Sequence, residues 1–278
     1  MVRFPRFEAR YPSLMRIVRF SPALADPALD LGKDPLFGVL GDGSIAVITG
    51  DPLYSGVKPT GQVVPLSQVR LLAPVLPRSK VVCIGKNYAD HAKEMGGEVP
   101  EEPIIFLKPN TSVIGPDDTI VWPGMSDRVD FEGELAIVIG RICKDVPKER
   151  AHDVIFGYTI GNDVTARDLQ KKDGQWTRAK GFDTFCPLGP WIETDFIPGD
   201  QKITTTLNGE VKQSARLSDM INNVPDIIHF VTQVMTLLPG DVILTGTPAG
   251  IGPMPEKASV TVSIEGLGEL TNKVSIHG

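Results

Sequence analysis

The sequence predicts an α+β protein that is rich in β-strands, with mixed or antiparallel sheets and few helices. Short runs of β-branched and aromatic residues, separated by Gly, Pro, Asp and Asn, recur along most of the 278 residues. The regular alternation of strand and helix that a doubly wound parallel sheet requires is absent. Hairpin signals at Asn208-Gly209 and Gly266-Leu-Gly268 favour antiparallel pairing.

The first 75 residues are predicted to form a loose extension followed by a small β domain. Residues 1–14 carry three Arg, one Glu and two Pro without an apolar stretch, so no secretory signal is expected there. The β domain, residues 15–75, is expected to contain the strands Arg16–Phe20, Phe37–Leu40 and Ser44–Ile48. A Pro-rich segment then marks the boundary, and residues 76–278 are expected to form a second, larger domain.

Strands dominate this larger domain. They are expected at Lys80–Ile84, Ile104–Leu107, Thr119–Trp122, Val129–Gly140, Phe156–Gly161, Leu188–Glu193, Lys202–Asn208, Asp241–Leu244 and Ser259–Ile264. Three helices are expected, at Tyr88–Met95, Lys148–Val154 and Pro225–Leu238. The last has Pro at its start, Pro239-Gly240 past its end and one apolar stripe, which is the usual pattern of helix start and stop signals.

Composition and charge argue against several classes of function. A hydrophobic content of 41% is typical of a soluble globular protein with a full core. The net charge of −6 argues against a nucleic-acid partner, and no apolar run approaches the ~18 residues of a membrane-spanning helix. Cys83, Cys143 and Cys186 lie in apolar surroundings and are interpreted as reduced core residues. We therefore expect a cytoplasmic protein that binds neither nucleic acid nor a membrane.

The segment Val129–Gly140 is the most informative part of the chain. Glu132 and Glu134 are two positions apart at the head of an apolar run, and residues at this spacing on a strand point to the same face. Two buried carboxylates side by side need a cation, and an all-oxygen pair favours a hard divalent ion such as Mg2+. The alternative is an edge strand whose Glu side chains are solvated.

Polar residues gather in three further segments. On the helix predicted over 88–95, His91 and Glu94 are neighbours on one face, either as a base for activating water or as an exposed helix pair. Asp163 ends a hydrophobic strand and is a candidate third carboxylate. Arg167 and Gln170 follow it and are candidates for binding an anionic substrate, with Asp168 either orienting Arg167 or capping a short helix.

The third segment, Trp176–Pro190, and the later turn 246–252 each add one candidate residue. Lys180, between Ala179 and Gly181, is expected to point inward toward a carboxylate cluster or a developing enolate. The turn 246–252 lacks the Lys-Ser/Thr of a phosphate-binding loop, and its better use is to present Thr247 and backbone N–H groups to a carboxylate.

Together these segments resemble the fumarylacetoacetate hydrolase family, in its short branch with one catalytic domain. The motifs that carry the resemblance span residues 75–275, and they are GKNYADHAKEM, KPNTSVIGP, DFEGELAIVIG, GNDVTARDLQ, RAKGFDTFCPLGP and LTGTPAGIG. The resemblance implies a mixed-sheet roll of the fumarylacetoacetase C-terminal type for 76–278, preceded by the small β domain. It also implies a homodimer.

The resemblance further implies a role for each candidate residue. One Mg2+ (or Mn2+) ion would be held by Glu132, Glu134 and Asp163. His91 and Glu94 match the family's His-Glu pair on a lid helix, and Lys180 matches its lysine beside the metal. Arg167, Gln170 and Thr247 match positions that contact oxygen atoms of the substrate.

The expected activity is metal-dependent cleavage of a 2-oxo acid or diacid through a stabilised enolate. The two main forms are C–C hydrolysis of an acylpyruvate and decarboxylation of oxaloacetate. The alternatives are a 2-hydroxyhepta-2,4-diene-1,7-dioate isomerase or a 5-oxopent-3-ene-1,2,5-tricarboxylate decarboxylase of aromatic catabolism, and a metal-binding relative without catalysis. Because His152, His229 and His277 lie outside the motifs, a zinc hydrolase is disfavoured.

Overall fold

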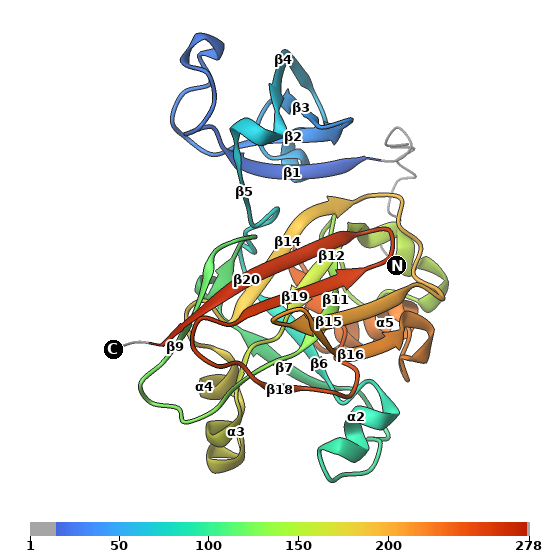
Figure 1. The fold of residues 1–278 in the computed structure, drawn as a ribbon. Helices are drawn as coiled ribbons and strands as arrows, with labels where there is room; N and C mark the ends of the chain where they lie inside the picture. The colour runs from blue at the N-terminus through green and yellow to red at the C-terminus, as the bar shows by residue number, and fades with distance from the viewer. Residues whose placement is uncertain (1–14, 277–278) are drawn as a thin grey trace.

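The protein has a β-rich α+β fold, as the sequence predicts. The structure is a computed structural model that describes residues 15–276. Within this range the strands form one large mixed sheet, a five-stranded sheet and a small three-stranded sheet (Figure 1). No helix among these residues is long and apolar enough to cross a membrane.

The large sheet has twelve described strands in the order β4-β3-β2-β1-β14-β12-β11-β17-β6-β7, with β5 beside β1 and β8 beside β14. Their bounds are β1 Arg16–Ser21, β2 Leu36–Gly41, β3 Ser44–Ile48, β4 Pro59–Pro65, β5 Arg70–Leu72, β6 Val81–Gly85, β7 Ile104–Lys108, β8 Val113–Ile114, β11 Gly133–Ile139, β12 Ile155–Asn162, β14 Cys186–Glu193 and β17 Val242–Leu244. Most pairs are antiparallel, and β6–β17 and β8–β14 are parallel.

The other two sheets cover the large one. The five-stranded sheet has the order β16-β15-β19-β20-β9, and the three-stranded sheet the order β13-β10-β18. Their bounds are β9 Thr119–Trp122, β10 Val129–Phe131, β13 Thr165–Ala166, β15 Lys202–Leu207, β16 Glu210–Arg216, β18 Gly252–Pro253, β19 Ser259–Ile264 and β20 Gly268–Ile276. Both predicted hairpins are present, because β15 pairs with β16 across Asn208-Gly209 and β19 with β20 across 265–267.

The N-terminal strands β1–β5 form a separate group at one end of the molecule (Figure 1). Val18, Phe20, Ile45, Val47 and Val64 are buried within a hydrophobic cluster of their own. This group joins the rest of the large sheet through β1, which pairs with β14 at Arg16–Glu193 and Ile17–Ile192. The three strands predicted here are present, whereas β4 and β5 were not predicted. Residues 1–14 lie outside the described range.

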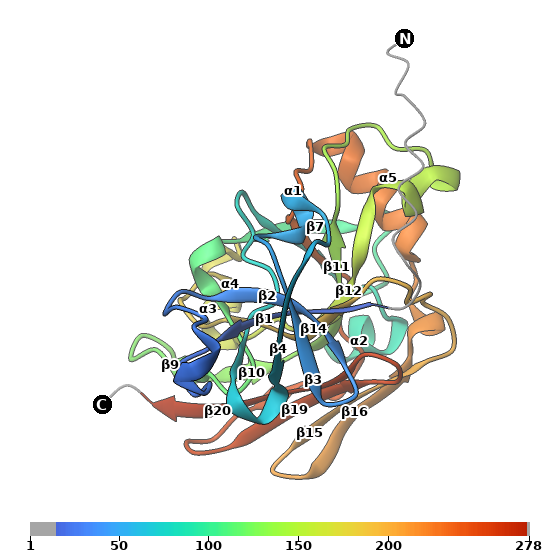
Figure 2. The same ribbon diagram turned by 90° about the horizontal axis from the view of Figure 1, so that it is seen from above.

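The strand β11 is buried on both faces. Leu135, Ile137 and Ile139 belong to one hydrophobic core, and Ala136 and Val138 belong to another. The helix α5 (Val224–Val234) packs in the first core together with residues of β15, β19 and β20. Figure 2 shows the molecule from above, with α5 near one end of β11 and β12. Burial on both faces explains why β11 reads as a continuous apolar run.

The helices are short. The predicted helix over 88–95 is α2 (Ala89–Glu94), and the segment Lys148–Val154 is a 3-10 helix. Further 3-10 turns occupy Pro27–Leu29, Leu66–Gln68, Asn110–Ser112 and Leu217–Asp219. The helices α1 (Pro52–Ser55), α3 (Arg167–Asp173) and α4 (Thr177–Lys180) were not predicted. The prediction that the last helix extends to Leu238 is wrong, because the backbone of Leu237 forms two hydrogen bonds with Cys143 beyond the end of α5.

Candidate active site

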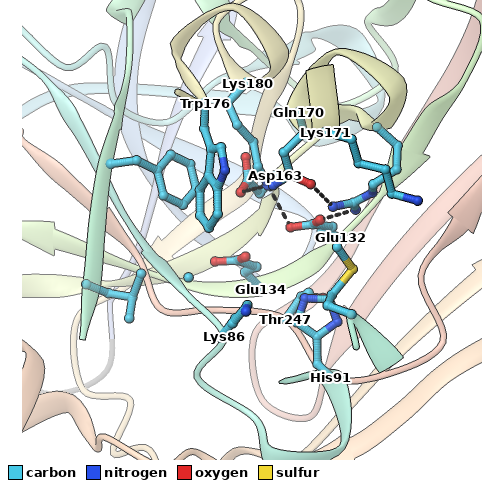
Figure 3. A pocket seen from close by; sticks show the side chains of 15 residues that line it. Lys86, His91, Glu132, Glu134, Asp163, Gln170, Lys171, Trp176, Lys180 and Thr247 are labelled. Atoms are coloured by element: carbon cyan, nitrogen blue, oxygen red, sulfur yellow. Dashed lines mark hydrogen bonds and ion pairs between the residues drawn. The ribbon is translucent and has the colours of Figure 1, made fainter. Parts of the chain in front are cut away.

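Three buried carboxylates converge where two neighbouring strands meet. Glu132 lies in the break between β10 and β11, Glu134 is the second residue of β11, and Asp163 directly follows β12. Since Gly133 pairs with Asn162 in the antiparallel ladder, the start of β11 lies beside the end of β12. Oxygen atoms from the three carboxylates lie within 4.8 Å of one another, and Figure 3 shows them facing the same space.

The prediction of one continuous strand over 129–140 is wrong at Glu132. The N–H of Glu132 donates to the Asn162 side chain at 2.9 Å, and its carbonyl accepts from the N–H of Asp163 at 2.8 Å. Its backbone therefore bonds to the residues that end β12 rather than continuing the β11 ladder. The edge-strand alternative is also wrong, because β11 lies between β12 and β17 and both Glu side chains are buried.

Buried cations pair with two of the three carboxylates. Lys180 Nζ donates to Glu132 at 2.9 Å and to Asp163 at 2.5 Å. Lys108 Nζ donates to the other oxygen of Asp163 at 2.5 Å, and Arg167 forms an ion pair with Glu132. Burial alone would raise the pKa of Glu132, but the charges of Lys180 and Arg167 hold it below its ordinary value. Glu132 is therefore held as an anion.

Glu134 has no such cationic partner among the described residues. Its carboxylate accepts one hydrogen bond, from the N–H of Gly246 at 2.7 Å. Burial, followed by the charges of Asp163 and Glu132, raises the pKa of Glu134 well above its ordinary value. A divalent cation between the three carboxylates would remove this repulsion, and all-oxygen donors suit Mg2+ or Mn2+. The residues present therefore fit a hard metal ion.

Arg167, the first residue of α3, is fixed on several sides. Besides its ion pair with Glu132, its Nε donates to Asp130 at 2.9 Å and its Nη1 donates to Gln170 Oε1 at 2.6 Å. The prediction that Asp168 orients Arg167 is wrong. Asp168 lies in the first turn of α3, and its carboxylate instead accepts a hydrogen bond from the Ser126 hydroxyl at 2.6 Å.

The His-Glu pair lies on α2, and its members differ in burial. His91 Nδ1 lies 3.1 Å from Glu94 Oε2, and the His91 side chain is only 7% exposed. The other oxygen of Glu94 accepts from the N–H of Gly250 at 3.1 Å. His91 Nε2 has no hydrogen-bond partner in the part of the chain that the structure describes. The alternative of a freely exposed helix pair therefore does not hold.

The turn 246–252 contributes through its backbone. Gly246 N–H binds Glu134 and Gly250 N–H binds Glu94, so this one turn contacts both the carboxylate cluster and α2. The Thr247 hydroxyl donates to the carbonyl of Gly133 at 2.9 Å and accepts from Gln213 at 2.7 Å. Thr247 is thus fixed beside β11, with its side chain at the edge of a cavity.

A cavity of about 190 Å3 joins these groups. All nine residues proposed from the sequence except Glu94 line it; they are His91, Glu132, Glu134, Asp163, Arg167, Gln170, Lys180 and Thr247. One wall is aromatic, because Phe106 and Trp176 pack edge to face at 5.2 Å. Lys180 Nζ lies 5.0 Å from the centre of the Phe106 ring, so this wall also covers the lysine.

Several residues at the site were not predicted. Lys108 and Asp130 each pair with a predicted residue, and Lys86, Met95 and Lys171 line the cavity. For Lys108 and Asp130 a signal exists: each is a charged residue within or at the end of an apolar strand run, where an unpaired charge is costly. Lys86, Met95 and Lys171 carry no comparable signal.

Comparisons with known proteins identify relatives over most of the chain. The family described as fumarylacetoacetate (FAA) hydrolase C-terminal matches residues 80–275, and the family described as Rv2993c-like, N-terminal matches residues 15–74. Protein Rv2993c of Mycobacterium tuberculosis is 62% identical over 222 residues, which are 79% of this chain and 83% of that protein.

Two further relatives carry the name of an activity. The mitochondrial oxaloacetate tautomerase FAHD2A of Homo sapiens is 46% identical over 224 residues, covering 76% of this chain and 71% of that protein. The crystal structure of a 2-hydroxyhepta-2,4-diene-1,7-dioate isomerase from Mycobacterium marinum matches with a TM-score of 0.85 and 50% identity, covering 95% of this chain and 99% of the other.

Proposed function

Because the chain belongs to the fumarylacetoacetate hydrolase family, we propose that it is a metal-dependent enzyme that acts on a 2-oxo acid through the enolate of that acid. The observation that carries the proposal is the meeting of three groups in one cavity: the carboxylate cluster, Lys180 and His91, which Glu94 contacts from outside the cavity. A carboxylate cluster alone would suit a binding protein. A base and a buried ammonium beside it provide for proton transfer and for stabilising negative charge.

Glu132, Glu134 and Asp163 would hold the metal ion. When bound, Mg2+ or Mn2+ supplies Lewis-acid stabilisation of negative charge on substrate oxygens. We assign the orientation of the substrate to Gln170, because its carbonyl oxygen accepts from Arg167 and its amide N–H groups have no partner among the described residues. Arg167 acts as a positioning residue, since its guanidinium is occupied by Asp130, Glu132 and Gln170.

Lys180 provides fixed positive charge for the enolate. Burial alone would lower the pKa of Lys180, but the charges of Asp163 and Glu132 raise it above its ordinary value, so the side chain is an ammonium ion. A donor of this kind beside a developing oxyanion contributes on the order of 3 kcal/mol to transition-state stabilisation. The aromatic wall of Phe106 and Trp176 limits the access of water on this side.

His91 is the proposed base. If Glu94 accepts the Nδ1 proton, the Nε2 lone pair is free to take a proton in the cavity. For hydrolysis of an acylpyruvate, this proton comes from a water that attacks the distal carbonyl. For tautomerisation or isomerisation, it comes from C3 of the 2-oxo acid and is returned to the substrate. Decarboxylation of oxaloacetate needs no base at this position.

Tautomerisation or isomerisation is the second candidate reaction, and the names of two relatives favour it. One relative is an oxaloacetate tautomerase, and a structural match is an isomerase of a hydroxy-dienoate diacid. Both reactions need the same base and the same stabilised enolate as hydrolysis, so the site residues are shared. What separates the reactions is whether a water molecule has access to the distal carbonyl.

The test compares kcat/KM for three reactions with Mg2+ and again in EDTA: cleavage of acetylpyruvate, decarboxylation of oxaloacetate and ketonisation of enol-oxaloacetate. Metal-dependent turnover in any of them supports the proposed chemistry, and the ratio identifies the preferred reaction. Full activity in EDTA, or no activity in all three, would contradict it.

A substitution of His91 separates the reactions further. We expect His91→Gln to lower kcat/KM for hydrolysis and for tautomerisation by about 100-fold or more, because general-base catalysis is lost, and to leave decarboxylation within about threefold. Equal losses in all three reactions would show that His91 has a structural role instead.

A further inference from the structure

A second hollow adjoins the cavity on the side of α3. It has a volume of about 200 Å3 and is lined by Glu94, Met95, Arg128, Arg167, Lys171 and Ile251. Met95, Arg167 and Lys171 also line the main cavity. The two hollows are therefore neighbours, and three residues within or next to α2 and α3 are common to both.

The charged residues of the second hollow are nearly all paired. Glu94 accepts hydrogen bonds from His91 and Gly250. Arg128 binds Asp130 through two N–H groups, at 2.8 and 3.2 Å, and Arg167 binds the same carboxylate at 2.9 Å.

Lys171 is the exception. Its ammonium has no hydrogen bond or ion pair with any residue in the range that the structure describes, although it stands at the junction of both hollows. Figure 3 shows it beside Gln170, on the side of the cavity where Glu132 lies. Because Glu94, Arg128 and Arg167 already have partners, Lys171 is the charged residue of this hollow that is available to bind an anion.

We propose that Lys171 is a specificity-determining residue that binds a second, distal carboxylate of the substrate, so that the enzyme prefers 2-oxo diacids to 2-oxo acids with an apolar end. The proposal rests on the proposed function, because the first carboxylate would bind at the metal ion that the carboxylate cluster would hold. A substrate oriented this way runs from the cluster past Met95 and ends at the Lys171 ammonium.

Lys86 is the competing candidate. It also lines the main cavity and has no partner among the described residues, but it does not line the second hollow. Figure 3 places it near Glu134, away from Lys171. Of these two lysines, only Lys171 lines the second hollow, where the distal carboxylate of a longer substrate would lie. We therefore assign the recognition of that carboxylate to Lys171.

The experiment measures Kd by calorimetry, in Mg2+, for 2-oxoadipate and 2-oxohexanoate. The two acids have the same length and differ only in a terminal carboxylate or methyl group. We expect the natural chain to bind the diacid at least about tenfold more tightly, which is typical for one charge-assisted contact. We expect Lys171→Met to remove this preference and to leave the affinity for 2-oxohexanoate within about twofold.

Lys172→Met is the matched control, because Lys172 is the next residue of α3 and lines neither hollow. It should keep the preference of the natural chain. The proposal is overturned if the natural chain shows no preference, if Lys171→Met keeps it, or if Lys86→Met removes it instead.

Turnover of succinylpyruvate and butanoylpyruvate, measured in parallel, separates this inference from the proposed function. Cleavage of butanoylpyruvate without any diacid preference removes the inference and keeps the proposed chemistry. The opposite result is a diacid preference that depends on Lys171 in a protein that neither cleaves, decarboxylates nor tautomerises any 2-oxo acid. That result would contradict the proposed function and would support the binding site at Lys171.

Discussion

Glu132 and Glu134 are two positions apart in the sequence, yet their electrostatic surroundings are opposite. Glu132 is paired with Lys180 and Arg167, and its pKa is held low even though burial opposes this. Glu134 faces two other carboxylates and one backbone N–H, and its pKa is raised. Removing the negative charge of Glu132 should therefore affect the stability of the metal-free protein differently from removing that of Glu134.

Charge removal at the two positions should have opposite effects on stability. Glu134→Gln relieves repulsion, so we expect an unchanged or higher Tm in EDTA together with loss of the Tm rise that Mg2+ causes. Glu132→Gln removes an anionic partner from two buried cations, Lys180 and Arg167, and should destabilise the metal-free protein by about 3 kcal/mol. Thermal unfolding in EDTA and in Mg2+ checks both variants, and a Glu134→Gln variant that still responds to Mg2+ would count against the metal site.

The three cysteines are core residues, as predicted. Burial raises the pKa of the Cys143 thiol to about 11 and that of Cys186 to about 12, and it raises that of Cys83 well above its ordinary value of 9.0. Cys186 is therefore not a reactive thiol at neutral pH.

These shifts predict a loss of stability in alkali. Above the ordinary pKa of 9.0, the unfolded thiols lose protons that the folded thiols keep, so the folded state binds more protons and the free energy of unfolding falls as the pH rises. Below about pH 8 the thiols should contribute no pH dependence. Urea unfolding between pH 7 and 10, with iodoacetamide labelling at pH 8, tests this: labelling of the native protein at the rate of free cysteine would contradict it.

At the scale of elements, the turn 246–252 links the carboxylate cluster to the helix α2. Its Gly250 has φ +99°, and a Cβ built there would lie 2.0 Å from the backbone oxygen of Lys212 on β16. The turn is thus packed against β16 by a contact that only glycine permits, while its N–H groups hold Glu134 and Glu94.

Gly250→Ala should therefore disturb both the fold and the site. We expect it to lower the free energy of unfolding by more than the ~1–3 kcal/mol of backbone strain alone, and to lower kcat/KM by releasing Glu94. Gly209→Ala is the matched control, because Gly209 also has a positive φ, +81°, but nothing within 4 Å of a Cβ built there. Equal effects of the two substitutions would show that the anchoring of α2 through this turn is unimportant.

The sequence predicted the long elements better than the short ones. β11, β12 and α5 were recognised because their apolar periodicity extends over many residues. α3 and α4 were missed because they have seven and four residues, too few for a helical period to appear, and tertiary contacts hold them in place. The break at Glu132 was missed because it depends on a hydrogen bond to Asn162, thirty residues away.

At the site, the nine candidate residues were named from the sequence, but two charged residues that pair with them were not. Lys108 and Asp130 stand out as charged residues of apolar strand runs, yet their partners are known only when β7 and β10 are placed beside Asp163 and Arg167. Lys171 and Lys86 resemble ordinary surface lysines in the sequence. Their positions follow from the folding of separate elements around one cavity, which local patterns do not specify.

At the scale of the whole molecule, the charges around the site leave an imbalance. Four buried carboxylates, those of Asp130, Glu132, Glu134 and Asp163, face three buried cations, those of Lys108, Arg167 and Lys180, and the half-exposed Arg128 also pairs with Asp130. One divalent ion would give this group of charges a positive sum. An anionic ligand should then be attracted much more strongly than without the metal.

We therefore expect the binding of oxalate, a mimic of the enolate of a 2-oxo acid, to depend on the metal. Its Kd should fall at least about 100-fold on addition of Mg2+, and Mg2+ with oxalate should raise Tm by more than the sum of their separate effects. Calorimetry in EDTA and in Mg2+ provides the test, with chloride and acetate as control anions. Equal oxalate affinity in both buffers would contradict this account of the charges.

The burial of β11 on both faces has a consequence for how the family of this protein can diversify. Glu134 stands on a strand that two hydrophobic cores hold in place, so any shift of this carboxylate must disturb both cores. Lys86, Met95 and Lys171 lie instead on short helices and turns around the opening of the cavity. Substitutions there can change which molecules are accepted while the chemistry stays the same. We therefore expect relatives of this chain to differ in substrate range through substitutions at Lys86, Met95 and Lys171. Substitutions in β11 should be tolerated much less often.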